Sequence, residues 1–406
     1  MRNFFKSSVV MKRYLSGIII VLMIITMIPS YVIATVEDDI TGHWAEETII
    51  KWKQKGLMTG YLDGTFKPDN NITKAEFISI INRIYGYYEK ADKNYRDIKD
   101  EDWYYNETII AKANKYMDWY KKEELKPNEE ITRQEVHAIL ATIQQQEATE
   151  QPEEKMTRAE VVTMLDRIVG ELINISGIYG PEKEEKVIEG NLTINTEGVI
   201  LKNAIINGNL ILAAGIKQGD ITLDNVTVKG KTIVNGGGEN SITLKNCSLH
   251  ELIVFKQDGK IRIVSIASEI GKTILLNGGK LQGDFKLITI IDKGENKEVN
   301  NIELKGKIEH IIVESQVDIK ISEGTKIKKI EVNNKSKGTK IDIQKSSVIE
   351  EMIFYAPTEV TGKGKIKKIS IKSKGVKVEQ KEATDESDTE EIPDVPHYTP
   401  DQNPPT

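Results

Sequence analysis

A repeat of about 20 residues fills the second half of the chain and restricts its fold more than any other feature. The strings GNLTI, GNLIL, GKTIV, HELIV and GKTIL begin at residues 190, 208, 230, 250 and 271, and KKIEV, EEMIF and KKISI begin at 328, 350 and 367. Each string has the alternating apolar pattern of a short β-strand. One such strand cannot bury its apolar face alone, so successive copies must stack. Residues 187–379 are therefore predicted to form an all-β solenoid of about nine rungs that resembles a right-handed parallel β-helix.

Three asparagines recur at one place in this repeat. Asn203, Asn225 and Asn246 follow the apolar segments ILK, ITLD and ITLK. Asparagine tolerates the left-handed backbone conformation, so these residues are expected to form a corner and to bond from rung to rung. Cys247 follows the third asparagine at a place that small apolar residues occupy in the other rungs, which predicts an inert core thiol. The pattern is lost between residues 271 and 310, where no rungs can be assigned.

The late part of the repeat is basic. Residues 301–380 contain 17 Lys and 11 Asp or Glu, a net charge of +6. Two interpretations stay open. Lysines keep exposed strand edges from pairing with other chains, and the alternative is a basic face for anionic polymers.

A five-residue motif occurs three times in the first half of the chain, as ITKAE at residues 72–76, ITRQE at 131–135 and MTRAE at 156–160. Thr followed three residues later by Glu is a capping box, in which the Thr oxygen and the Glu carboxylate accept amides of the first helical turn. Apolar residues follow each motif at helical spacing. Each motif therefore predicts the start of an amphipathic helix.

Each motif also carries a cation between its Thr and its Glu. Lys74, Arg133 and Arg158 would each lie in the first helical turn, where a positive charge opposes the helix dipole by about 0.3–1 kcal/mol. One interpretation is a solvated or salt-bridged surface cation. The other is an anion site, in which the cation and the free amides of the helix start hold a carboxylate or phosphate together.

The segments ahead of the motifs correspond to one another as well. DITGHWAEETIIKWKQKGLMTGYLDGTFKPDNN precedes the first motif and DIKDEDWYYNETIIAKANKYMDWYKKEELKPNEE the second, with a Pro four residues before each motif. The Asp-Ile lead, the Trp that opens the first helix, the Gly-rich turn and the motif together resemble the S-layer homology repeat, over roughly residues 38–172. The resemblance implies an all-α front with copies at 35–90, 91–146 and, truncated, 147–175. The chain would then be an α+β multidomain protein, with a linker near residues 177–186.

The resemblance implies non-covalent attachment to the bacterial cell wall. Members of this family typically fold three copies into a pseudo-trimer, whose grooves bind secondary wall polysaccharide with acidic, often pyruvylated, sugars. In physical terms a Trp can stack on a sugar, a Gly lets the backbone approach, and a cation can pair with a carboxylate. The alternative for the tryptophans is a place in the helix-packing core. The positions of this chain that match the family's binding motif are Asp39, Trp44, Gly60, Lys74, Asp97, Trp103, Arg133 and Arg158.

The second and third copies depart from the family pattern. The second has Trp119, Lys122 and Glu123 where the first has the glycines and aspartate of its turn, and the third keeps only the part from its Pro onward. One or two grooves are therefore expected to be incomplete, and Lys74 cannot form the two-pronged contact of an Arg. Because Arg158 belongs to the truncated copy, its replacement is expected to leave the fold intact and to weaken binding least.

The favoured function is a structural or interaction protein, with no enzymatic activity, no cofactor, no metal and no nucleic acid partner. The alternative is a wall-anchored polysaccharide-active β-helix enzyme, a lyase or a hydrolase, because parallel β-helices include such enzymes. That chemistry needs clustered carboxylates or paired acids and bases. The aspartates of the repeat are scattered instead, His250 and His310 stand alone, and no phosphate loop, nucleophile elbow or zinc motif occurs. The scattered aspartates are Asp220, Asp224, Asp258 and Asp284.

The two ends of the chain predict export and a disordered tail. Lys6, Lys12 and Arg13 precede an apolar run, and a small residue at Ala34 follows it, so residues 1–34 read as a signal peptide. An uncleaved membrane anchor is the alternative, although the run is short for a span. The segment 380–406 has one Lys against eight Asp or Glu and no hydrophobic periodicity. A secreted protein of the cell wall or cell surface, with no stable membrane span after cleavage, is therefore expected.

Overall fold

The computed structural model describes residues 39–117, 123–239, 242–257, 259–291 and 301–379, together with a short strand at Thr384–Asp385. The predicted signal peptide, most of the predicted tail, and the positions Trp119, Lys122 and Asp258 lie outside the described residues.

The described residues of the first half contain five α-helices, which are α2 (Glu46–Gln54), α3 (Lys74–Tyr85), α4 (Tyr105–Ala113), α5 (Arg133–Ile143) and α6 (Arg158–Val169). The three helices that follow the motifs begin where the sequence predicts. Thr73, Thr132 and Thr157 each accept the amide of the Glu three residues later, and that Glu accepts the amide of the Thr. All three predicted capping boxes are confirmed.

The three motifs meet at one point through backbone hydrogen bonds. Ile72 N–H donates to the Met156 carbonyl (3.0 Å), Met156 N–H to the Ile131 carbonyl (3.2 Å), and Ile131 N–H to the Ile72 carbonyl (2.9 Å). These bonds form a closed triangle. The helices are therefore joined in a ring through short antiparallel bridges as well as through their apolar core.

The second half is a solenoid of parallel strands with three faces. The first face contains β2 (Gly177–Tyr179), β8 (Ile242–Lys245), β10 (Arg262–Ile266), β14 (Asp318–Ile321), β16 (Thr339–Ile343), β18 (Thr358–Gly362), β20 (Lys377–Val378) and the starts of the long strands β5 (Val199–Ile206), β7 (Ile221–Val234), β12 (Gly279–Ile290) and β13 (Asn301–Val313). The second face contains β3 (Lys186–Ile188), later parts of those long strands, and the starts of β9 (Ser248–Val254), β11 (Glu269–Leu275), β15 (Lys326–Val332), β17 (Val348–Phe354) and β19 (Lys365–Ile371). The third face contains β1 (Glu171–Ile173), β4 (Leu192–Ile194), β6 (Leu210–Leu212), β21 (Thr384–Asp385) and the ends of β7, β9, β11, β12, β13, β15, β17 and β19.

Rungs of unequal length explain why part of the repeat is hidden in the sequence. Paired residues on successive rungs lie 15 positions apart at Thr273 and Ile288, but 23 apart at Gly279 and Ile302. Strands β12 and β13 run through the corner without a break, and Gly283 and Gly306 take φ angles of 126° and 127° there. The described parts of the unassigned stretch, residues 271–291 and 301–310, therefore belong to the same stack, with Gly instead of Asn at the corner.

The predicted asparagine corner is confirmed, and its ladder is shorter than predicted. Asn203, Asn225 and Asn246 have φ angles of 50°, 56° and 52°, in the left-handed region. Asn225 donates to the Asn203 side chain (2.9 Å), whereas Asn246 donates to Asp224 (3.3 Å). Cys247 is buried in the solenoid core, and burial raises the pKa of its thiol, in agreement with an inert role.

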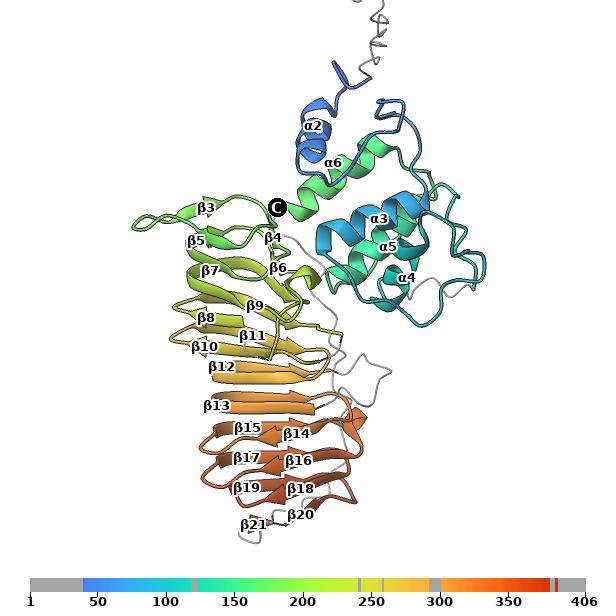
Figure 1. Ribbon diagram of the computed structural model, residues 1–406. Helices are drawn as coiled ribbons and strands as arrows, with labels where there is room; N and C mark the ends of the chain where they lie inside the picture. Colours follow the sequence, from blue (N-terminus) through green and yellow to red (C-terminus); the bar gives the residue numbers. More distant parts are fainter. Residues whose placement is uncertain are drawn as a thin grey trace, which may run out of the picture.

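The solenoid starts earlier than residue 187, and its first rungs are hydrogen-bonded to the helices. Strand β2 lies inside the expected linker and pairs with β5. Asn191 donates to the Ile168 carbonyl (2.9 Å) at the end of α6, and Asn195 donates to the Ile84 carbonyl (2.8 Å) at the end of α3. The first rungs therefore satisfy carbonyl groups that two helices leave open at their C-termini. Figure 1 shows the helices beside β4 and β6, with the later rungs extending away from them.

Candidate functional site

The three motif cations bind glutamates of neighbouring motifs. Each cation pairs with the capping-box glutamate of another copy, and the pairs are Arg158 with Glu76 (3.0 Å), Lys74 with Glu135 (2.9 Å) and Arg133 with Glu160 (3.0 Å). The Lys74 and Arg158 residues are 6% and 3% exposed. These ion pairs close a ring around the backbone triangle, and each glutamate offsets the clash between the cation and the helix dipole.

The first amide of each motif helix is also occupied. Lys74 N–H donates to the Glu129 carbonyl, Arg133 N–H to the Glu154 carbonyl and Arg158 N–H to the Asn70 carbonyl, each at 2.9 Å. The hypothesis of an anion site built on free helix-start amides is therefore wrong for these amides. Of the two interpretations of the cations, the salt-bridged one describes them, although Lys74 and Arg158 are buried between copies instead of lying on the surface.

Arg158 holds the turn of the first copy in place. Its Nε donates to the Phe66 carbonyl (2.8 Å), and its Nη2 donates to the Thr59 carbonyl (2.9 Å). The guanidinium also lies 4.7 Å from the ring centre of Tyr61, within cation–π range. The arginine of the truncated third copy therefore supports the complete turn of the first copy.

Gly60 is needed in this turn because no side chain fits there. A Cβ on Gly60 would lie 2.5 Å from the Thr65 carbonyl oxygen, and the turn is closed by Tyr61 N–H donating to that carbonyl (2.8 Å). Asp63 accepts from the Thr65 hydroxyl (2.6 Å) and pairs with Lys67 (3.0 Å), and these contacts lower the pKa of Asp63 to about 2. The equivalent turn of the second copy lies largely outside the described residues.

A groove runs between the first and second copies beside this turn. Its volume is about 640 Å³, and it contains three of the predicted site residues, Gly60, Trp103 and Arg158. Trp103 is 62% exposed, so the helix-core alternative is wrong for it and its indole is free to stack on a ligand. The other lining residues are Met58, Thr59, Tyr61, Leu62, Asn71, Thr73, Glu76, Ser79, Ile80, Arg83 and Asn128.

None of these eleven other lining residues was predicted as a site residue from the sequence. Tyr61, Arg83 and Asn128 come from the turn, from α3 and from the loop ahead of α5. A signal for Arg83 was present, because Glu76, Ser79, Ile80 and Arg83 have the spacing of one helix face. Arg83 is exposed, and its Nη1 donates to the Leu57 carbonyl (2.8 Å).

The other predicted site residues lie elsewhere. Asp39 accepts the amides of Phe66 and Lys67, and Asp97 accepts those of Leu125 (3.0 Å) and Lys126 (2.7 Å). These two carboxylates tie the start of each copy to the loop before its motif, and neither lines the groove.

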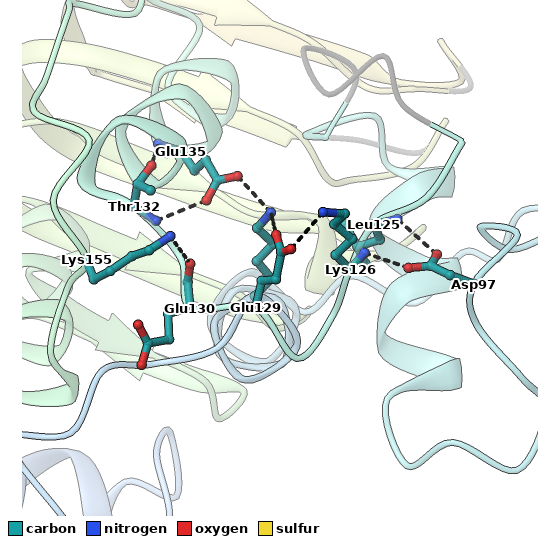
Figure 2. A network of polar contacts seen from close by, with 9 residues as sticks. Asp97, Leu125, Lys126, Glu129, Glu130, Thr132, Glu135 and Lys155 are labelled. Atoms are coloured by element: carbon teal, nitrogen blue, oxygen red, sulfur yellow. Dashed lines mark hydrogen bonds and ion pairs between the residues drawn. The ribbon is translucent and has the colours of Figure 1, made fainter.

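Other charged side chains occupy the space around Lys74. Lys74 lies 3.4 Å from Glu129 as well as 2.9 Å from Glu135. Glu129 also pairs with Lys126 at 2.8 Å (Figure 2). Lys155 donates to the Glu130 carbonyl (2.8 Å) beside them. In the order of the ring a Trp of the third copy would stand here, but that copy lacks its first half.

Trp44 is 64% exposed and stands in the first copy where Trp103 stands in the second. The core alternative is therefore wrong for Trp44 too. In the first groove the turn, the Trp and the cation come from the first, second and third copies. The same succession around the ring groups Trp44 with the Arg133–Glu160 pair and with the Gly turn of the third copy, which is missing. Among the described residues, the first groove alone brings a turn Gly, an exposed Trp and a motif cation together.

The expectation that His310 of the solenoid stands alone is wrong. His310 Nε2 lies 3.3 Å from Glu331 on the next rung, so this histidine does not stand alone. Glu331 also pairs with Lys329, and this contact raises the pKa of Lys329. Asp224 pairs with Lys245 (3.0 Å), which lowers the pKa of Asp224.

No helix within the described ranges is long and apolar enough to cross a membrane.

Comparison with known proteins identifies the first copy. The S-layer homology domain family matches residues 38–78. Cell surface glycoprotein 1 of Acetivibrio thermocellus is 40% identical over 74 residues, which are 18% of this chain and 3% of that protein. The cellulosome-anchoring protein of the same organism is 34% identical over 116 residues, 26% of this chain and 25% of that protein. The surface-layer 125 kDa protein of Lysinibacillus sphaericus is 28% identical over 97 residues, 24% of this chain and 8% of that protein.

The chain spans at most a quarter of the length of these three relatives. The relatives point to the cell surface and to anchoring at the wall. The chain carries an S-layer homology domain at residues 38–78, followed by a β-solenoid that extends from residue 171 to residue 378.

Proposed function

We propose that this chain is a secreted, non-enzymatic protein of the cell surface, which an acidic secondary wall polysaccharide holds non-covalently in the groove of Gly60, Trp103 and Arg158. The observation that carries the proposal is the meeting of these three residues in one groove, at the copy that matches the S-layer homology domain family. The solenoid is then the part that the anchored protein displays.

The chemistry of the groove suits a sugar with one carboxylate. Arg158 and Glu76 offset each other, which leaves the exposed Arg83 as the excess charge among the lining residues. Arg83 can pair with a carboxylate while the Trp103 ring stacks on the sugar face. A pyruvyl ketal supplies such a carboxylate on an otherwise neutral sugar, so a pyruvylated polysaccharide is the ligand that we propose.

A structural or interaction role for the solenoid is supported by how its titratable groups are used. Asp224 and Glu331 are both engaged by lysines. The enzyme alternative would need an acid and a base that face a common substrate. Activity on wall polysaccharides that is lost on changing His310 or Glu331 would overturn the non-enzymatic part of the proposal.

Sedimentation with purified walls tests the anchor, and the chain offers a matched control. Trp103→Ala and Trp44→Ala remove side chains of the same type and nearly equal exposure from corresponding places in two copies. We expect Trp103→Ala to weaken binding about tenfold and Trp44→Ala to change it less than twofold, because stacking on an aromatic ring contributes about 1–3 kcal/mol. Binding of the unchanged chain should disappear when secondary polymers are stripped from the walls. Equal losses in the two variants, or binding to stripped walls, would contradict the proposal.

A further inference from the structure

The lysine excess of the late rungs is concentrated on one side of the solenoid. The second face and the corner that leads into it carry eight lysines and three glutamates between residues 305 and 367, and all eleven are exposed. The lysines are Lys305, Lys307, Lys326, Lys328, Lys345, Lys363, Lys365 and Lys367, and the glutamates are Glu309, Glu323 and Glu350. This side therefore accounts for +5 of the net charge of +6 on residues 301–380.

Each of the three glutamates has one lysine partner. The pairs are Lys328 with Glu309 (3.3 Å), Lys345 with Glu323 (3.3 Å) and Lys367 with Glu350 (3.4 Å). Five lysines are left without a carboxylate within 4.0 Å among the described residues. We call these five the lysine surface, and they are Lys305, Lys307, Lys326, Lys363 and Lys365.

The lysine surface follows the axis of the rod. Lys307 and Lys326 are direct neighbours on paired strands, and Val348 and then Lys365 continue the same column. Adjacent strands lie about 4.8 Å apart, so an extended polymer along this column meets three cations over four rungs, with Val348 between the second and the third. A groove of about 770 Å³ runs along the same face, and its charged lining residues are five lysines and four carboxylates, Lys286, Lys307, Lys326, Lys328, Lys367, Glu269, Asp284, Glu309 and Glu350.

Protection of a strand edge does not explain Lys307 or Lys326. Lys307 lies on β13 and Lys326 on β15, and both strands have neighbours on both sides, so neither offers an open edge. The first face of the same rungs shows what a balanced surface looks like. Its lysines alternate with acids in the pairing, with Asp318 beside Lys340 and Lys320 beside Asp342.

We propose that the lysine surface binds a linear glycopolymer whose repeating units are joined by phosphodiesters, laid along the solenoid axis. Lysine is a compact point charge that suits a phosphate oxygen, whereas a planar carboxylate is matched best by the fork of an Arg, and residues 301–379 contain no Arg. The proposal rests on the proposed wall attachment only for its location. It gives the rod a second contact with the wall, apart from the groove in the helical half.

Binding of the full chain to poly(glycerol phosphate), measured in solution at 50 and 200 mM salt, tests the proposal. The variant Lys307→Gln/Lys326→Gln/Lys365→Gln should bind about tenfold more weakly at low salt and should show a shallower salt dependence, since three phosphate contacts are lost. The matched control is Lys320→Gln/Lys340→Gln/Lys377→Gln, which removes the same charge from exposed lysines of the first face. This control should bind within twofold of the unchanged chain.

Equal losses in the two triple variants would overturn the proposal, because net charge alone would then explain binding. Tighter binding of polygalacturonate or of duplex DNA than of poly(glycerol phosphate) at equal charge would overturn the assignment to a phosphodiester glycopolymer. A third variant, with Arg at the same three positions, keeps the charge and should keep binding, and its loss of binding would also count against the proposal. Trp103→Ala should leave this binding unchanged, so failure here and failure of the anchoring groove are distinguishable.

Discussion

The helical half and the solenoid are both built from repeats, but one closes into a ring and the other stacks in a line. In the ring, every copy supplies parts of its neighbours' sites, as when Arg158 of the third copy supports the turn of the first. In the line, each rung pairs only with the rungs before and after it, so rungs of 15 and of 23 residues fit into one rod. An incomplete copy therefore removes parts of sites elsewhere in the ring, whereas the solenoid accommodates a rung of unusual length.

The two halves also differ in charge. Residues 39–175 contain 19 Lys or Arg and 26 Asp or Glu, a net charge of −7, against +6 for residues 301–380. An anionic polymer is repelled by the helical half as a whole, so binding there depends on specific contacts in the groove. The late rungs attract the same polymer along a whole face. Salt should therefore weaken binding to the solenoid more than binding to the groove.

Among these substitutions, the loss of Arg158 should lower the free energy of unfolding most. Arg158→Ala removes the buried guanidinium, which leaves Glu76 without its ion pair and the Phe66 and Thr59 carbonyls without their donor, and this should lower the free energy of unfolding by about 3–5 kcal/mol. Denaturant unfolding followed by fluorescence measures the change. Arg133→Ala is the matched control, since Arg133 is 27% exposed and has one ion pair, and it should cost about 0.5–1 kcal/mol. Equal costs for the two variants would show that the ring does not depend on its third copy in this way.

The line has its own sensitive point at the Gly corner. A Cβ on Gly306 would lie 2.0 Å from the Gly283 carbonyl oxygen, so Gly306→Ala should destabilise the solenoid by about 2–3 kcal/mol. Gly324→Ala also introduces a side chain at positive φ, but nothing lies within 4 Å of its Cβ, so about 1 kcal/mol is expected. Thermal unfolding followed by circular dichroism compares the two variants. A smaller cost at Gly306 than at Gly324 would be inconsistent with the close contact.

The Asn corner should be more tolerant. Asn225→Ala removes one hydrogen bond to Asn203, and Ala267 already occupies a left-handed position with φ 49° in the same solenoid. A loss of about 1 kcal/mol in unfolding free energy is therefore expected. A loss above about 3 kcal/mol, by the same unfolding measurement, would mean that the ladder carries more of the rod's stability than its single bond implies.

The smallest effect should come from the turn of the first copy. The Asp63 pKa of about 2 lies below the ordinary value of about 3.9. The ionised carboxylate therefore stabilises the fold above about pH 4, and this contribution is lost as the pH falls through 2. The difference in melting temperature between the unchanged chain and Asp63→Asn should shrink over that range. A difference that stays constant down to pH 2 would assign the effect to something other than the ionised carboxylate.

The sequence was informative where the rule is local. The capping boxes at Thr73, Thr132 and Thr157 were predictable because the interacting groups lie three residues apart. The partners of the motif cations were not, because Arg158 and Glu76 are 82 positions apart and only the closed ring brings them together. The sequence led to the expectation that Arg158 matters least, since it lies in the truncated copy. The structure places it in the most complete groove instead.

The solenoid shows the same limit. Its Asn corner was visible as a regular spacing, but the turn from Asn to Gly at Gly283 and Gly306 hid the middle rungs. The early strands β1 and β2 were missed because they are short and lack the string that marks the other rungs. The hydrogen bonds from Asn191 and Asn195 to the helix ends depend on packing between the two halves, so no local sequence pattern predicts them.

The number of wall-polysaccharide sites on each chain tests the central claim most directly. Calorimetric titration of the full chain with a purified, pyruvylated wall-polysaccharide fragment measures this number. One site per chain is predicted, which is lost in Trp103→Ala and kept in Trp44→Ala, because one position of the ring combines the turn Gly, the exposed Trp and the motif cation. Two or three equivalent sites, or a single site that Trp44→Ala removes and Trp103→Ala leaves intact, would contradict the account.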